Sequence, residues 1–177
     1  CNIEPRKNLI RAVRTFVEFI NKNKINDLIW VMGGGQWDSF VEELEKQNIK
    51  WDTSLIIKAG YIDDEDLSIL YSNAEWFVYT SQYEGFGLPA VEAMSCGSLL
   101  LAATGGSLPE IVGSGGVLFE PDNDEQLAQL LCDAVEGASY LTPIRKAGIE
   151  RSQLYSWERT ANLTYAAYRD ALKVSGN

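Results

Sequence analysis

Histidine is absent from all 177 residues of the chain. Its absence excludes a Ser-His-Asp triad, a Cys-His pair and any histidine-based metal site within this sequence. Cysteine is also scarce, because Cys1, Cys96 and Cys132 form an odd set without the spacing of a metal or redox motif. We therefore expect reduced thiols, as in a cytosolic protein, rather than a disulfide framework.

Long apolar runs and an excess of positive charge are missing as well. No run approaches the roughly 20 apolar residues that a membrane-spanning helix needs. Acidic residues outnumber basic residues by 25 to 15, which gives a net charge of −10. This balance argues against a nucleic-acid partner and against a broad surface for anionic lipid, but it leaves room for a small cationic pocket.

The composition that remains is that of a globular domain. Apolar residues make up 46% of the chain and charged residues 23%, which suffices for a sizeable core. The length predicts a single domain over residues 1–177. Because the chain opens at Cys1 without Met and without a signal segment, we expect it to be a piece of a longer protein.

Short apolar runs alternate with amphipathic stretches along the whole chain. The runs predict strands over 28–32, 54–59, 76–80, 98–103 and 117–119, and the stretches between them predict helices. In the last helix Trp157, Tyr165 and Leu172 share one face, and we expect the aromatic residues to serve packing. The alternation predicts an α/β fold with a doubly wound parallel sheet, whose ligand loops follow Met32, Gly60, Thr80 and Ala103.

The segment SQYEGFGLPAVEAM, residues 81–94, follows one of these strands. Gly85 and Gly87 allow a ligand to approach the backbone, and Pro89 suits the first position of a helix, whose amino end favours phosphate. Glu84 and Glu92 flank this turn, and carboxylates accept hydrogen bonds from pairs of hydroxyls. The order of carboxylate, glycine-rich turn, helix start and second carboxylate fits a nucleotide sugar, in which the phosphates lie between two polyhydroxylated groups. From spacing alone, a strand–helix turn with two solvated acids stays an alternative.

This segment resembles the E-x7-E signature of the retaining glycosyltransferase family usually numbered four. Four other stretches agree with that family in order, namely Glu4–Leu9, Gly60–Ile62 with residues 67–74, Leu108–Ile111 and Tyr155–Glu158. The resemblance extends from about Glu4 to Ala171, so it covers nearly the whole chain. It implies the carboxy-terminal, Rossmann-like, donor-binding half of a GT-B glycosyltransferase.

The resemblance also implies roles for individual residues. Glu84, Arg6 and Lys7 would be the catalytic set: the two cations neutralise the donor diphosphate, and Glu84 contacts sugar hydroxyls. Glu92 would bind the ribose, and the backbone near Ile62 would meet the base, on which Tyr61 could stack. The amides of Gly85, Phe86, Gly87 and Leu88 would hold the sugar and phosphate. Gly33 and Gly34, in a glycine triplet after a predicted strand, are weaker candidates for ligand contact.

The reaction implied is transfer of a hexose, with retained configuration, from a GDP- or UDP-sugar to a saccharide or lipid-linked acceptor. No metal or other cofactor is expected. The acceptor would be held by an amino-terminal GT-B domain that this chain lacks, in cytoplasmic polysaccharide biosynthesis, with any membrane contact made through that missing domain. One departure concerns Asn2, which stands where many relatives have Gly-Arg, so Arg6 is the candidate substitute.

Three other hypotheses stay open at this point. Asp64 and Asp66 form a D-x-D that could belong to a metal-dependent GT-A transferase, although acids in the first turn of a helix also offset its dipole. Glu84 and Glu92 could be a glycosidase pair. The chain could also be a non-catalytic nucleotide-sugar-binding module or one subunit of a split enzyme.

Overall fold

The computed structural model describes residues 4–35, 37–50 and 52–175, so Asn2 lies outside the described residues. Five strands form two parallel ladders. Strands β1 (Trp30–Gly33) and β2 (Ile56–Gly60) make one ladder, and β3 (Trp76–Tyr79), β4 (Leu99–Ala103) and β5 (Val117–Phe119) make the other, in the order β3-β4-β5. The parallel α/β prediction is confirmed, but the backbone hydrogen bonds divide the sheet where we expected it to be continuous.

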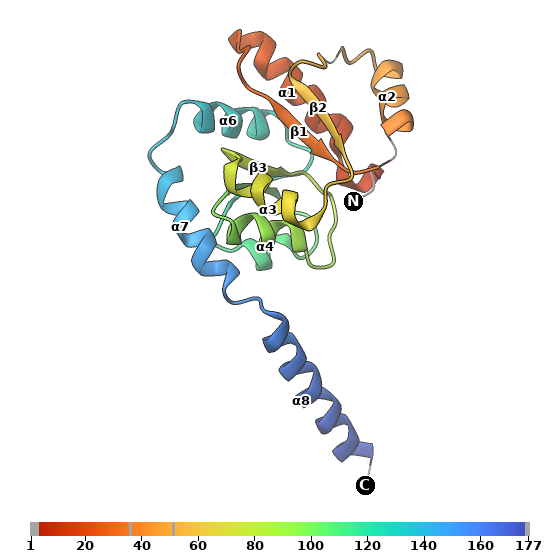
Figure 1. Ribbon diagram of the computed structural model, residues 1–177, viewed down its shortest axis with the longest axis vertical. Helices are drawn as coiled ribbons and strands as arrows, with labels where there is room; N and C mark the ends of the chain where they lie inside the picture. Colours follow the sequence, from red (N-terminus) through yellow and green to blue (C-terminus); the bar gives the residue numbers. More distant parts are fainter. Residues whose placement is uncertain (1–3, 36, 51, 176–177) are drawn as a thin grey trace.

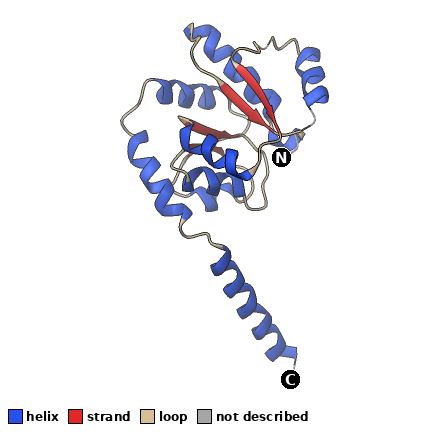
Figure 2. Cartoon of the chain, viewed as in Figure 1, coloured by secondary structure: helices blue, strands red, loops and turns tan. Residues whose placement is uncertain are grey.

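Helices separate the strands along the chain, as Figures 1 and 2 show. A short 3-10 helix η1 (Pro5–Lys7) opens the described chain. The α-helices are α1 (Leu9–Asn23), α2 (Trp37–Lys46), α3 (Asp64–Asn73), α4 (Leu88–Ser95), α5 (Leu108–Val112), α6 (Asp124–Val135), α7 (Leu141–Ser152) and α8 (Trp157–Ser175).

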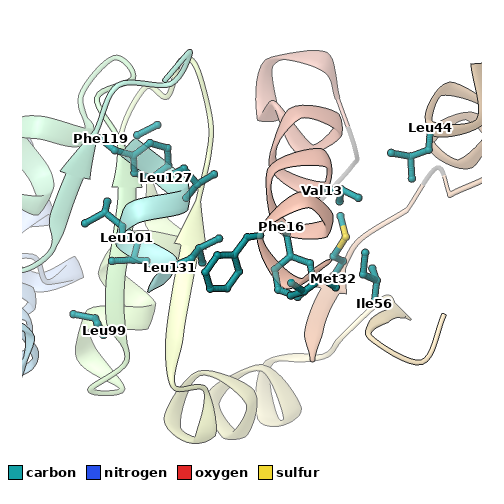
Figure 3. Packing of buried hydrophobic residues seen from close by; sticks show 14 of the residues in the cluster. Val13, Phe16, Met32, Leu44, Ile56, Leu99, Leu101, Phe119, Leu127 and Leu131 are labelled. Atoms are coloured by element: carbon teal, nitrogen blue, oxygen red, sulfur yellow. The ribbon is translucent and has the colours of Figure 1, made fainter. Parts of the chain in front are cut away.

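The three-stranded ladder is covered on both faces, which explains why every residue of β4 is buried. Leu99, Leu101 and Ala103 face the larger core, together with side chains of α1 and α6. Figure 3 shows this core reaching from Leu101 and Leu131 across Phe16 to Met32 of β1. On the other face of β4, Leu100 and Ala102 join a smaller core with residues of β3, α4 and α5.

Several boundaries follow local side-chain chemistry rather than hydrophobic pattern. The second strand begins at Ile56 and not at Ser54, because the Asp52 carboxylate accepts hydrogen bonds from the backbone N–H and hydroxyl of Ser54 and closes a turn. Asn123 caps α6 as its sequence indicates, since Asn123 Oδ1 accepts from the N–H of Gln126 at 2.9 Å. The short helix α5 was not predicted.

The expectation that the aromatic face of the last helix is packed is wrong. Figure 1 shows α8 projecting away from the sheet. Trp157 is 76% exposed, and Tyr165, Tyr168 and Leu172 are also exposed. The periodicity of these residues is real, but no other element of the described chain covers the face they form. Among the described residues, no helix has both the length and the apolar character needed to cross a membrane.

Candidate functional site

The first part of the site is the short helix η1, which carries the two predicted cations. Its turn closes with a hydrogen bond from the N–H of Lys7 to the carbonyl of Glu4 at 2.9 Å. The end of β3 then fixes η1 in place. Thr80 Oγ1 donates to the carbonyl of Lys7 at 2.6 Å, and the N–H of Gln82 donates to the carbonyl of Arg6 at 2.8 Å. Residues more than 70 positions apart in the sequence are therefore brought together by hydrogen bonds to the carbonyls of η1.

Both cations contact Glu84, and they do so at the same oxygen. Lys7 Nζ lies 2.5 Å from Glu84 Oε1, and Arg6 Nη1 lies 3.2 Å from that atom. The Tyr79 hydroxyl is 3.5 Å from Lys7 Nζ, which also lies 5.4 Å from the centre of the Tyr79 ring. We call Arg6, Lys7, Tyr79 and Glu84 the cationic cluster. It unites the three residues to which the resemblance assigns catalysis.

The cluster keeps Glu84 ionised. Burial opposes ionisation of this carboxylate, but the hydrogen bond from Lys7 and the charge of Lys7 outweigh it and lower the pKa of Glu84 to about 2. Burial and the neighbouring Glu84 both raise the pKa of Tyr79, so its phenol stays protonated. A carboxylate with such a low pKa is unsuited to donate a proton, so Glu84 could not serve as the acid of a glycosidase pair.

The glycine-rich loop connects Glu84 to helix α4. Gly87 precedes the helix with a φ of 95°, in the left-handed region that favours glycine, and a Cβ there would lie 2.6 Å from Leu108 Cδ2. A Cβ on Gly85 would meet nothing within 4 Å, so the space beside this residue is open. Phe86 and Leu88 are exposed. The loop thus packs tightly at Gly87 and presents Gly85 to solvent.

A second loop, between β4 and α5, holds the first, and its residues were missed by the sequence analysis. Ser107 donates from its N–H to the carbonyl of Glu84 at 3.0 Å and from its hydroxyl to the carbonyl of Phe86 at 3.0 Å. Gly105 and Gly106 lie against the backbone of residues 81–84, and a Cβ on either would collide with it. The available signal was the Gly-Gly pair directly after a buried strand.

The later landmarks of the sequence meet the same loop. The rings of Phe86 and Tyr155 make an edge-to-face contact, with centres 5.6 Å apart. The Tyr155 hydroxyl donates to the carbonyl of Ile111 at 3.1 Å. Tyr155 therefore ties α5 and the glycine-rich loop to the segment that leads into α8.

The second glutamate of the signature lies apart from the cationic cluster. Glu92 is on α4, one turn inside the helix, and is exposed. Partial burial and the charge of Asp64 raise the pKa of Glu92, while interaction with Tyr71 works in the opposite direction. Tyr71 itself is buried, on α3, with its ring 5.1 Å from that of Phe77. Glu92 consequently faces α3.

The remaining predicted residues lie at the ends of β1 and β2, and we call Gly33, Gly34, Tyr61 and Ile62 the β1–β2 edge. The N–H of Gly34 donates to the carbonyl of Gly60 at 2.7 Å, and a Cβ on Gly33 would lie 2.6 Å from Ile62 Cδ1. Tyr61 is 89% exposed. The structure therefore brings the predicted base-binding residues together, on a more open surface than that of the cationic cluster.

The acids of the D-x-D segment do not gather into a metal site. Asp64 and Asp66 belong to the first turn of α3. Within residues 4–35, 37–50 and 52–175, no group of three or more His, Cys, Asp or Glu side chains is placed to hold a metal ion. A cavity of about 230 Å³ lies elsewhere, between Trp76, Leu99 and Arg145 at the opposite ends of β3 and β4.

Comparison with known structures places the fold among glycosyltransferases. Sucrose-phosphate synthase from Thermosynechococcus elongatus superposes with a TM-score of 0.75 at 27% identity, over 97% of this chain and 44% of that one. HepE from Anabaena, solved in complex with UDP and glucose, gives a TM-score of 0.78 at 20% identity, over 97% of this chain and 47% of that one.

Sequence comparison gives the family. Residues 2–151 match the model of the family "Glycosyl transferases group 1", and the chain belongs to that family. Among curated relatives, the O-antigen chain mannosyltransferase B of Escherichia coli is 31% identical over 168 residues, which are 94% of this chain and 44% of the relative. The chain thus spans less than half the length of that relative. Family membership and the GT-B neighbours exclude the GT-A alternative for Asp64 and Asp66.

Proposed function

We propose that this chain is the donor-binding half of a glycosyltransferase that moves a sugar, with retained configuration, from a GDP- or UDP-sugar to a saccharide or lipid-linked acceptor. The observation that carries the proposal is the convergence of Arg6 and Lys7 on one oxygen of Glu84, beside the glycine-rich loop that leads into α4. Two cations at the amino end of a helix form a favourable site for a diphosphate.

In this proposal the cationic cluster serves the departing diphosphate. Negative charge develops on the leaving phosphate as the bond to the sugar breaks, and Arg6 and Lys7 stabilise it from fixed positions. The amides of residues 85–88 hold the phosphate and the sugar, and Glu84 accepts hydrogen bonds from sugar hydroxyls. The acceptor attacks from the face on which the diphosphate leaves, which retains the configuration.

The other end of the donor extends towards α3 and the β1–β2 edge. Glu92 accepts hydrogen bonds from the ribose hydroxyls, because its exposed carboxylate is not engaged by any cation that the structure describes. The backbone at Ile62 meets the base, and the exposed ring of Tyr61 stacks on it. HepE, which has a similar fold, was solved in complex with UDP, and this supports nucleotide binding by the present fold.

The acceptor is assigned to a domain that the chain does not contain. The relative named as an O-antigen chain mannosyltransferase supports mannose as the sugar and a surface polysaccharide as the product. We propose the cytoplasm as the compartment of this reaction. We place an amino-terminal domain of the same protein against the uncovered apolar face of α8. The donor diphosphate is neutralised by Arg6 and Lys7 without a metal ion.

Calorimetric titration tests donor binding directly. The chain is titrated with UDP, GDP, UDP-glucose and GDP-mannose, with and without EDTA, as wild type and as Lys7→Ala and Glu92→Ala. We expect binding that EDTA leaves unchanged, weakened about 100-fold by Lys7→Ala and about tenfold by Glu92→Ala. Lys146→Ala is the matched control, because Lys146 is on α7 with a side chain 83% exposed.

Three outcomes would contradict parts of the proposal. Absence of nucleotide binding would contradict a donor domain, and binding lost in EDTA would contradict the metal-free site. Turnover by the 177-residue chain alone would contradict its assignment as half of an active site. The hypotheses of a binding module or a split-enzyme subunit predict binding without turnover, and a gene encoding a preceding domain in the same reading frame decides against both.

A further inference from the structure

The two cations that we propose for the diphosphate both pair with Glu84. Arg6 and Lys7 meet on Glu84 Oε1, as they would on a phosphate oxygen. The Lys7 and Glu84 side chains are only 9% and 11% exposed. An ion pair so close to full burial depends on both partners, because removal of one charge leaves the other poorly solvated. Glu84 is therefore an anion with which a phosphate group would compete for both cations.

A ligand that binds to Arg6 and Lys7 comes close to the negative charge of Glu84. A nucleoside diphosphate ends in a phosphate monoester, whose second ionisation near pH 6 gives it almost two negative charges at neutral pH. In a nucleotide sugar the same phosphate is a diester with one charge, followed by sugar hydroxyls that can donate to a carboxylate. Glu84 thus repels the end of the free diphosphate and attracts the end of the nucleotide sugar.

The backbone of Glu84 is held in place, so a ligand bound to Arg6 and Lys7 must lie close to the Glu84 charge. Ser107 holds the Glu84 carbonyl by its N–H and hydroxyl, at 3.0 and 3.1 Å. Gly106 lies against the Glu84 backbone, so the loop cannot withdraw from that side. The carboxylate is ionised at neutral pH, because the hydrogen bond and the charge of Lys7 favour its charged form.

We propose that Glu84 is a specificity-determining residue that lowers the affinity of the site for free nucleoside diphosphate relative to nucleotide sugar, by keeping a negative charge on Arg6 and Lys7 until sugar hydroxyls engage it. The inference rests on the proposed function and adds a second role to Glu84. Discrimination of this kind favours departure of the diphosphate product after transfer.

The test compares two ratios of dissociation constants. UDP and UDP-glucose, and GDP and GDP-mannose, are titrated into the wild-type chain, Glu84→Gln and Glu84→Asp. Glu84→Gln keeps the shape and removes the charge, whereas Glu84→Asp keeps the charge. We expect Glu84→Gln to bind the free diphosphates more tightly and to lower the ratio of the Kd for diphosphate to the Kd for nucleotide sugar about tenfold or more. We expect Glu84→Asp to stay near the wild-type ratio.

Glu4→Gln is the matched control for charge. Glu4 contacts the same Arg6 at 2.8 Å, but its side chain is 42% exposed and forms no bridge to Lys7 that the structure describes. Its charge is screened by solvent, so both ratios should change by no more than about twofold. Circular dichroism and thermal unfolding verify that each variant is folded, and Glu84→Ala replaces Glu84→Gln if the latter is not.

The outcomes separate this inference from the proposed function. If the charge-free variant loses affinity for diphosphate and nucleotide sugar equally, Glu84 only orients the cations and the inference is overturned. If the ratio is unchanged while the wild type binds both ligands, the inference fails and the donor domain stands. If the wild type binds no nucleotide at all, both fail together.

Discussion

The cationic cluster and the β1–β2 edge are built in opposite ways, although both come from loops at the ends of parallel strands. Lys7 and Glu84 are almost buried, and their carbonyls accept hydrogen bonds from the hydroxyl of Thr80 and the N–H of Ser107, respectively. Tyr61 of the β1–β2 edge is almost fully exposed. A preorganised end costs little to order when a ligand binds, and an open end must be ordered by the ligand itself. Under the proposed function, we therefore expect affinity to come from the cationic cluster and nucleotide preference from the β1–β2 edge.

The largest effect on stability should come from a substitution in the loop that packs against the backbone of Glu84 in the cationic cluster. Gly106 has a φ of 62°, and a Cβ there would collide with the carbonyl oxygen of Glu84. We expect Gly106→Ala to lower the free energy of unfolding by about 3 kcal/mol, because strain and collision add. Gly137→Ala is the control, with a φ of 67° and nothing within 4 Å, and should cost about 1 kcal/mol. Equal losses in urea unfolding would contradict tight packing at Gly106.

The second-largest effect should come from acid, which should weaken the cationic cluster. The pKa of Glu84 is about 2 in the folded chain and near 4.5 in an unfolded one. The folded state therefore favours the ionised form, and its stabilisation is complete above about pH 4.5 and lost as pH falls towards 2. The loss is at most about 3 kcal/mol. Unfolding free energies at several pH values should converge for wild type and Glu84→Gln in this window, and a pH-independent difference would contradict the assignment.

A smaller effect should come from the Tyr79 hydroxyl. Tyr79→Phe keeps the ring beneath Lys7 and removes the oxygen 3.5 Å from Lys7 Nζ. We expect donor affinity to fall about threefold to tenfold, in line with one hydrogen bond to a charged group. Tyr140→Phe is the control, because Tyr140 bonds Asp133, away from the cluster. Identical calorimetric affinities for Tyr79→Phe and wild type would show that the ring alone positions Lys7.

The smallest effect should be at the open edge. Tyr61→Ala removes an exposed ring, so it should leave stability unchanged and weaken nucleotide binding about fivefold, the low end for base stacking. The loss should differ between UDP and GDP, because the two bases have different stacking areas. Tyr83→Ala, another exposed tyrosine, is the control. Equal losses for both nucleotides, measured by calorimetry, would contradict a base contact.

Much of the cationic cluster could be predicted because its residues carry local signals. Glu84 stands before two glycines and a proline, and Arg6 and Lys7 lie in a short stretch that the family resemblance marks. The structure brings these three together, while their individual roles stay predictions. The order of strands and helices could likewise be predicted from the apolar runs, although β2 begins at Ile56, two residues later than expected.

The parts that could not be predicted depend on distant neighbours. Gly105, Gly106 and Ser107 act through backbone contacts with residues 81–86, and no periodicity encodes such a contact. The division of the sheet into two ladders depends on how the strands sit in space. The apolar face of α8 illustrates a further limit of prediction. The periodicity of Trp157 and Leu172 predicts that the helix has an apolar side, but it does not predict which element covers that side.

The paired glycines after β4 also bear on how this domain can change its substrate. A Cβ on either glycine would meet the backbone of the neighbouring loop, so under the proposed function a substitution there should displace every donor alike and lower kcat/KM for all of them by a common factor. Under the same proposal, a change at Tyr61 or Ile62 of the open β1–β2 edge should alter the affinity for one nucleotide relative to another. We therefore expect donor preference to change through the β1–β2 edge while the glycine pair stays constant.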